Sequence, residues 1–207
     1  TNAMKRILLT LLFLILAVAG SYWYKFSNAG GGDTGPKQEP IALKKHSDNF
    51  NQAVSTAMNA YFAMSAAFVD ADTSKAKDNG RKFIQLMDSI PMNEKKKDTT
   101  NIYDAAIGSF ANIKANAESI LLQTDITEMR KDFSMVSENL YPFFKLVNYE
   151  GKSMYWQNCP MAFGDDKGAN WISSTKEVVN PYLGKNHPEF RGTMLHCGSV
   201  KDTIKAQ

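Results

Sequence analysis

Residues 48–69 read DNFNQAVSTAMNAYFAMSAAFV, and this stretch indicates how the chain folds. Its larger side chains recur at steps of three and four residues, which places them on one face of a helix. The positions on this face are Phe50, Val54, Met58, Tyr61, Phe62, Ser65 and Phe68. The stretch therefore predicts a long amphipathic helix. It ends at Asp70-Ala71-Asp72-Thr73, where Asp72 is a candidate N-cap for the next helix.

Three further segments repeat the helical pattern. They are residues 74–89, which Pro91 closes, residues 100–123, and a last segment that begins at Asp125 and runs to Val147. Apolar residues recur at helical spacing in each of them. Because four amphipathic helices with short connections favour an antiparallel up-down arrangement, we predict a mainly α fold built on an antiparallel four-helix up-down bundle.

The last of these segments carries two local signals. Glu128 follows Asp125 by three residues, which is the pattern of a capping box at a helix N-terminus. Pro142 lies inside the segment and has no backbone N–H to donate. We therefore predict a kink or a break in this helix near Tyr141.

The character of the sequence changes at about residue 148. Glycine and proline recur through the remainder, residues 148–205, which predicts a small loop-rich C-terminal subdomain. We expect short strands around Met154–Trp156 and Thr193–Leu195, and helical spacing survives only in residues 173–179 and 200–204. This cap and the helical part, residues 47–147, would form a single exported domain over residues 47–205.

The beginning of the chain predicts export. Met4-Lys5-Arg6 precedes an apolar run over residues 7–19, and Ala17-Val18-Ala19 has the small residues of a cleavage site. With Tyr22-Trp23-Tyr24 as an aromatic belt, the run is also nearly long enough to span a bilayer. Residues 4–25 are thus either a signal peptide or an N-terminal membrane anchor. Both alternatives place the rest of the chain in the periplasm or cell envelope, attached to the inner membrane in the second case.

Residues 26–46 predict a flexible linker between this segment and the folded domain. Their Gly30-Gly31-Gly32, Gly35-Pro36 and Pro40 give them little capacity to bury apolar surface.

Composition and motifs exclude several classes of function. The net charge is only +3 and the basic residues form no stripe with aromatics, so we expect no nucleic-acid partner. The sequence has no His-Glu-x-x-His, Gly-x-Ser-x-Gly or phosphate-binding Gly-x-x-x-x-Gly-Lys motif. We therefore expect that the protein is not an enzyme.

The chain has two cysteines, and each lies close to a methionine. Cys159 is followed by Met161, and Cys197 is preceded by Met194 and His196. Thiolate and thioether sulfur are the ligands that suit soft metals such as Cu(I), and His196 adds a nitrogen donor. These five residues are the candidate metal ligands. Hard ligands that would complete a zinc tetrahedron are not grouped nearby.

A disulfide is the alternative for the same two cysteines. An even number of cysteines in an exported chain is the usual setting for one. A Cys159–Cys197 disulfide would stabilise the fold by about 4 kcal/mol on the chain-entropy account. In the metal-binding alternative, Trp156 and Trp171 would shield the site from water and oxidant. A reduced pair could bind metal and close to a disulfide when oxidised.

The C-terminal sequence resembles an uncharacterised exported domain family, a domain of unknown function. The resemblance covers about residues 47–205. Its motif residues are Cys159-Pro160-Met161-Ala162, Gly168-Ala169, Trp171-Ile172-Ser173, Glu177-Val178, Asn180-Pro181-Tyr182, Gly184, Met194 and Cys197-Gly198.

Members of that family occur alone and fused to periplasmic adaptor subunits of copper/silver-type heavy-metal efflux pumps. The resemblance therefore implies a role in Cu(I) or Ag(I) handling, with a metal-efflux adaptor or another envelope protein as partner. The alternative is a non-catalytic structural or protein-interaction module of the envelope that carries a Cys159–Cys197 disulfide.

Overall fold

The computed structural model describes residues 46–98 and 100–205. The predicted signal peptide or anchor, residues 4–25, and all of the predicted linker except His46 lie outside the described residues. Within the described residues, no helix combines the length and the apolar character needed to cross a membrane.

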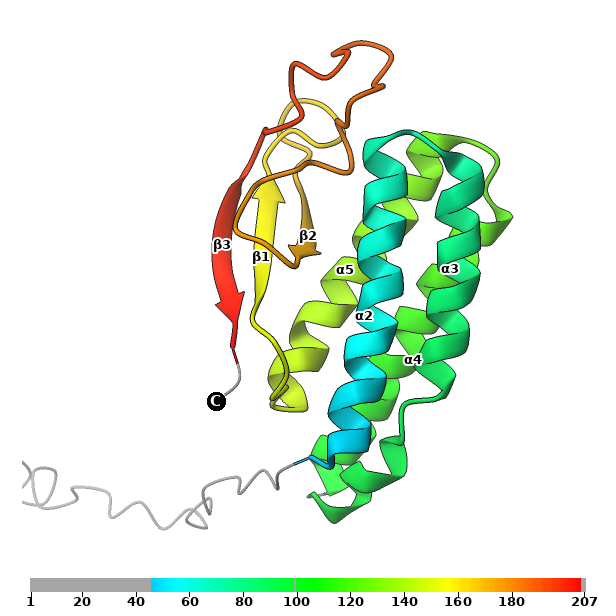
Figure 1. Ribbon diagram of the computed structural model, residues 1–207, viewed down its shortest axis with the longest axis vertical. Coiled ribbons are helices and arrows are strands. Elements are labelled where there is room, and N and C mark those ends of the chain that lie inside the picture. The colour runs from blue at the N-terminus through cyan, green and yellow to red at the C-terminus, as the bar shows by residue number, and fades with distance from the viewer. Residues whose placement is uncertain (1–45, 99, 206–207) are drawn as a thin grey trace, which may run out of the picture. The chain divides into compact units, whose positions relative to one another are not determined.

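The described part of the chain is mainly helical and ends in a small antiparallel sheet (Figure 1). Each long helix packs on the next one along the chain. A short 3-10 helix, η1, spans Met92–Lys97. The long helices are α2 Asp48–Val69, α3 Thr73–Asp88, α4 Thr100–Leu122 and α5 Ile126–Leu146.

Side-chain caps explain where these helices begin. The side chain of Asp72 accepts a hydrogen bond from Lys75 N, so the predicted N-cap of α3 is confirmed. Asp125 accepts from the backbone N–H groups of Thr127 and Glu128 at the start of α5. Glu128 itself pairs with Lys131, so Asp125 caps the helix without the reciprocal half of a capping box.

Of the kink or break predicted near Tyr141, the break is wrong, because α5 continues through Pro142 to Leu146. Pro142 is exposed and lies near the end of the helix, while Phe143 and Phe144 after it are buried in the core. Burial of two aromatic side chains stabilises by several kcal/mol, which offsets the about 3 kcal/mol cost of one proline inside a helix.

The C-terminal sheet has three strands in the order β2-β1-β3, and both pairs are antiparallel. β1 spans Met154–Cys159 and confirms the strand expected around Met154–Trp156. β2 spans Ala169–Ser173 and β3 spans Ser199–Ile204.

Other expectations for this region are wrong. Residues 193–195 form turns, residues 174–177 are bends, and residues 200–204 form a strand rather than a helix. Val200, Thr203 and Ile204 are β-branched, and pairing with β1 outweighs the weak helical spacing.

The sheet packs against the helices through β2, which contacts α5 (Figure 1). A buried hydrogen-bonded group joins the two layers. The hydroxyl of Tyr61 on α2 lies 2.7 Å from Ser137 Oγ on α5 and accepts a hydrogen bond from Ile172 N on β2 at 3.1 Å. All three residues are fully buried, so this group fixes the sheet relative to α2 and α5.

Candidate functional site

The structure brings the two cysteines together. Cys159 is the last residue of β1 and is fully buried, whereas Cys197 lies in the loop before β3 and is half-buried. Their sulfurs are 2.8 Å apart, and both thiols are free. A disulfide bond measures about 2.05 Å, so the two sulfurs are not bonded at this separation, although they lie closer than the ordinary contact distance of two unbonded sulfur atoms.

The absence of a side chain at Gly198 allows Cys197 to approach Cys159. Gly198 follows Cys197 and has a φ of +135°, a conformation that side-chain-bearing residues rarely adopt. A Cβ at Gly198 would lie 2.6 Å from Asn158 O and 3.1 Å from the ring of Trp171. The loop can therefore run against the end of β1 only because residue 198 has no side chain.

A buried asparagine holds the loop in place. Asn180 is fully buried, and its Nδ2 donates to Cys197 O at 2.8 Å. Its Oδ1 accepts from the backbone N–H groups of Tyr182 and Leu183, and its own backbone N–H donates to Leu195 O. One side chain thus ties the segment after β2 to the segment that carries Cys197.

The surroundings favour the neutral thiol. Burial raises the pKa of the Cys197 thiol well above its ordinary value, and the contact with Cys159 adds to this effect. Trp171 and Tyr182 are both buried nearby and meet edge to face, with ring centroids 5.8 Å apart. Burial also raises the pKa of Tyr182. A thiol in such surroundings is a weak nucleophile at neutral pH.

The two tryptophans have different positions. Trp171 flanks the backbone of Gly198, the residue after Cys197. Trp156 stacks on Tyr141 of α5 at a centroid distance of 4.5 Å, so it packs the sheet against the helix.

The three other candidate ligands lie in the loops that adjoin the cysteines. Met161 is half-buried and lines a cavity between the loop after β1 and the loop that follows Pro181. Met194 is half-buried against the core, and its carbonyl accepts from Cys197 N at 2.9 Å, so the two residues close one turn. His196 is exposed, and its Nδ1 lies 2.7 Å from Val178 O.

The His196 contact fixes its tautomer. A carbonyl oxygen can only accept, so in the neutral imidazole Nδ1 carries the proton and Nε2 keeps its lone pair. Histidines that bind metals usually donate their other ring N–H to such a carbonyl.

Within residues 46–98 and 100–205, no three His, Cys, Asp or Glu side chains gather as a metal-binding group. A four-ligand zinc site of those residue types is therefore missing from this part of the chain. The donors that the structure does bring together are two soft thiols, which fit a soft metal ion held by few ligands.

The sequence did not reveal the roles of Asn180 and Gly198 in this site. Both occur in the motif of the family resemblance, but only the folded loops show that Asn180 is a hydrogen-bonding centre and that the backbone at Gly198 approaches β1 closely.

Arg130 is a further residue whose position was not predicted, since it is buried although charged. Its sequence signal is its position beside Met129 and three residues before Phe133 on a buried helix face.

Comparison with known families supports part of the resemblance. A family described as protein of unknown function (DUF3347) matches residues 57–152. The match begins within α2, includes α3, α4 and α5, and ends before β1. The motif around Cys159 and Cys197 lies outside the matched residues. No curated protein and no solved structure matches the chain.

Proposed function

We propose that this protein is an exported accessory protein that binds a soft metal ion, Cu(I) or Ag(I), in heavy-metal efflux or resistance. The observation that carries the proposal is the contact between two free thiols, Cys159 and Cys197, at the end of β1. Two thiolates side by side suit a soft ion far better than they suit a hard one.

The candidate ligands have graded roles in this proposal. Cys159 and Cys197 supply the thiolates. Met161 and Met194 supply thioether sulfur from the adjoining loops, and His196 is a reserve donor through Nε2. The carbonyl of Val178, which orients the His196 ring, supports this last assignment.

Metal binding requires the two sulfurs to separate. With metal–sulfur bonds of about 2.3 Å, a tetrahedral site places two sulfurs about 3.8 Å apart, roughly 1 Å more than their present distance. Cys197 is half-buried in a loop, so the movement falls on this residue and not on Cys159 in the sheet. Binding also removes protons from the thiols, so metal affinity should rise with pH.

The second candidate function is a non-catalytic structural or interaction module of the cell envelope. The 2.8 Å sulfur separation favours it, because a thiol oxidant of the cell envelope that removes two electrons and two protons would form the disulfide with a shortening of only about 0.8 Å. In this function the Cys159–Cys197 disulfide holds the loop-rich cap, and the helical surface contacts an envelope protein such as a metal-efflux adaptor.

Both candidates share one scaffold and one location. We infer that α2–α5 form an antiparallel four-helix up-down bundle, which the packing of each helix on its successor supports. The protein acts in the periplasm or cell envelope, held at the inner membrane if residues 4–25 stay attached. We also propose that it binds no nucleic acid and is not an enzyme. The raised pKa of Cys197 argues against a cysteine nucleophile.

A competition titration tests the metal proposal. Reduced full-length protein should take about one equivalent of Cu(I) from a chromophoric chelator. Cys159→Ser and Cys197→Ser should each weaken binding by at least about a hundredfold, and Met161→Leu with Met194→Leu by about tenfold. Met135→Leu, at an exposed position of α5, is the matched control and should bind normally.

A thiol titration separates the two candidates. Unfolded protein that was never reduced should show two free thiols if the pair serves metal binding alone, and none if it is a disulfide. Failure of the reduced protein to take up Cu(I), together with zero thiols in the unreduced protein, would leave the structural module as the function.

A further inference from the structure

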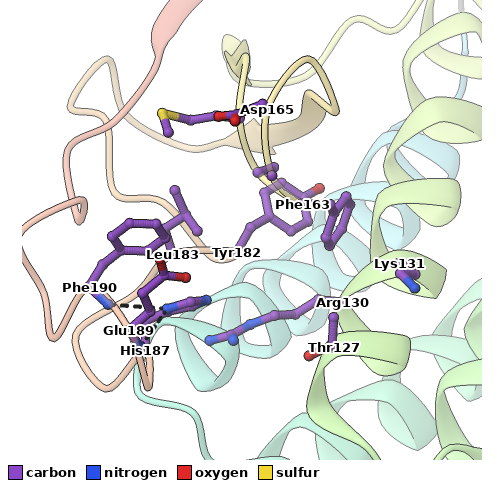
Figure 2. A pocket seen from close by; sticks show the side chains of 13 residues that line it. Thr127, Arg130, Lys131, Phe163, Asp165, Tyr182, Leu183, His187, Glu189 and Phe190 are labelled. Atoms are coloured by element: carbon purple, nitrogen blue, oxygen red, sulfur yellow. Dashed lines mark hydrogen bonds between the residues drawn. The ribbon is translucent and has the colours of Figure 1, made fainter.

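We propose that the cavity beside the N-terminal end of α5 binds a small monocarboxylate with an aromatic or branched apolar group. The cavity has a volume of about 430 Å³ and opens between three walls. One wall is the first turns of α5, the second is the loop after β1, and the third is the loop from Tyr182 to Phe190 (Figure 2). Its volume lies in the range of small-molecule sites.

A desolvated cation lines this cavity. Arg130 is only 3% exposed, and Figure 2 shows its side chain reaching from α5 toward the loop with His187 and Glu189. Its Nε donates to Pro181 O and its Nη2 to Phe68 O. None of the ion pairs among the described residues includes Arg130.

The two hydrogen bonds of Arg130 go to carbonyl oxygens, and the carboxylate of Asp125 stabilises its charge from a distance without forming an ion pair with it. Burial lowers the pKa of Arg130 to about 10, which leaves the group cationic at neutral pH. A guanidinium has about five N–H donors, so the two hydrogen bonds to carbonyl oxygens leave further donors available for a ligand. A carboxylate in the cavity would supply a counter-charge in direct contact with the guanidinium.

His187 adds a neutral donor to the same cavity. Its Nδ1 accepts from the backbone N–H groups of Glu189 and Phe190, so Nε2 carries the proton. Burial lowers the pKa of His187, and the positive charge of Arg130 lowers it further. The ring is therefore a donor without a charge at neutral pH. Thr127 also lines the cavity.

Aromatic side chains supply an apolar surface for the rest of the ligand. Phe163 meets Tyr182 edge to face at 5.3 Å, and Phe190 stacks on His187 at 5.0 Å. Lys131 also lines the cavity, but its charge is paired with Glu128. The exposed carboxylates of Asp165 and Glu189 border the cavity and would repel a polyanion. The combination selects one negative charge and an apolar body, and disfavours phosphate groups.

Phenylacetate is a suitable probe, with its neutral amide phenylacetamide and inorganic phosphate as comparisons. Two-dimensional NMR of the ¹⁵N-labelled full chain should show saturable shifts at residues of the three walls. We expect a dissociation constant on the order of 1 mM or lower for phenylacetate, and at least about tenfold weaker binding of phenylacetamide. Absent saturation, equal binding of the amide, or preference for phosphate would overturn the proposal.

Substitutions of lining residues test whether phenylacetate binds in this cavity. Arg130→Met should abolish the preference for phenylacetate over its amide, whereas Arg81→Met, at an exposed arginine of α3, should leave it unchanged. If Arg130→Met does not fold, Phe190→Ala and Thr127→Val decide the question. Each should weaken phenylacetate by about threefold or more, and Phe62→Ala, outside the cavity, should not. Unchanged affinity in both lining variants would contradict the proposal.

Discussion

Gly198 is the residue whose backbone lets Cys197 approach β1. Its φ is positive, and a Cβ at this position would lie 2.6 Å from Asn158 O, so there is no room for a side chain. Gly198→Ala should lower the free energy of unfolding by more than about 1 kcal/mol and shift the Cys159–Cys197 equilibrium toward the dithiol. Urea denaturation and titration in glutathione buffers measure the two effects.

Gly108→Ala provides the matched control for that substitution. Gly108 lies inside α4, and a Cβ there would meet nothing within 4 Å. Because alanine favours a helix over glycine, Gly108→Ala should raise the free energy of unfolding by about 0.5–1 kcal/mol. Equal effects of the two substitutions would show that the Gly198 backbone does not constrain the cysteine loop.

At the scale of elements, Pro142 shows how a helix tolerates a local defect. α5 continues through Pro142 because the residues that follow it are buried. Pro142→Ala restores a backbone donor at an exposed position, so it should raise the free energy of unfolding by about 1–2 kcal/mol. Denaturant unfolding checks this expectation. A loss of stability would mean that the proline is needed for the packing of Phe143 and Phe144.

Helix positions could be predicted from the sequence because each helix depends on local spacing and local caps. The 3.6-residue pattern over residues 48–69 and the Asp72 and Asp125 caps all act within a few residues. The strands β2 and β3 could not be predicted in the same way. Their pairing partner is β1, and the pairing depends on loops whose course the sequence pattern does not specify.

The candidate site was predictable in part for the same reason. Cys159 and Cys197 stood out by residue type, but their contact results from the long-range pairing of β3 with β1. Arg130 and His187 are far apart in the sequence, and only the folded loop after Pro181 brings both to one cavity. Residue type indicates chemistry, whereas proximity is a property of the whole fold.

At the scale of the whole molecule, buried tyrosines make stability depend on alkaline pH. Burial raises the pKa values of Tyr61 and Tyr182 above the value of about 10 expected in the unfolded chain. The unfolded chain therefore loses these protons first. Their contribution to stability is complete below pH ~10 and is lost as the pH rises above it, by up to about 1.4 kcal/mol per group and pH unit.

Chemical denaturation between pH 8 and about pH 11.5 measures this dependence. The free energy of unfolding should be level at first and then fall steeply. Tyr61→Phe should be less stable at neutral pH, because Ile172 N loses its buried acceptor, but its stability should fall less steeply in alkali. An unchanged alkaline slope in Tyr61→Phe would mean that ionisation of the Tyr61 hydroxyl does not contribute to the loss of stability in alkali.

We expect the reduced Cys159–Cys197 pair to hold a soft metal ion. X-ray absorption at the copper edge of the reduced, Cu(I)-loaded full-length protein would identify the atoms bound to that ion. We predict a nearest shell of sulfur atoms that loses sulfur in Cys159→Ser and in Cys197→Ser. A shell made of nitrogen and oxygen alone, or one that both substitutions leave unchanged, would contradict the claim.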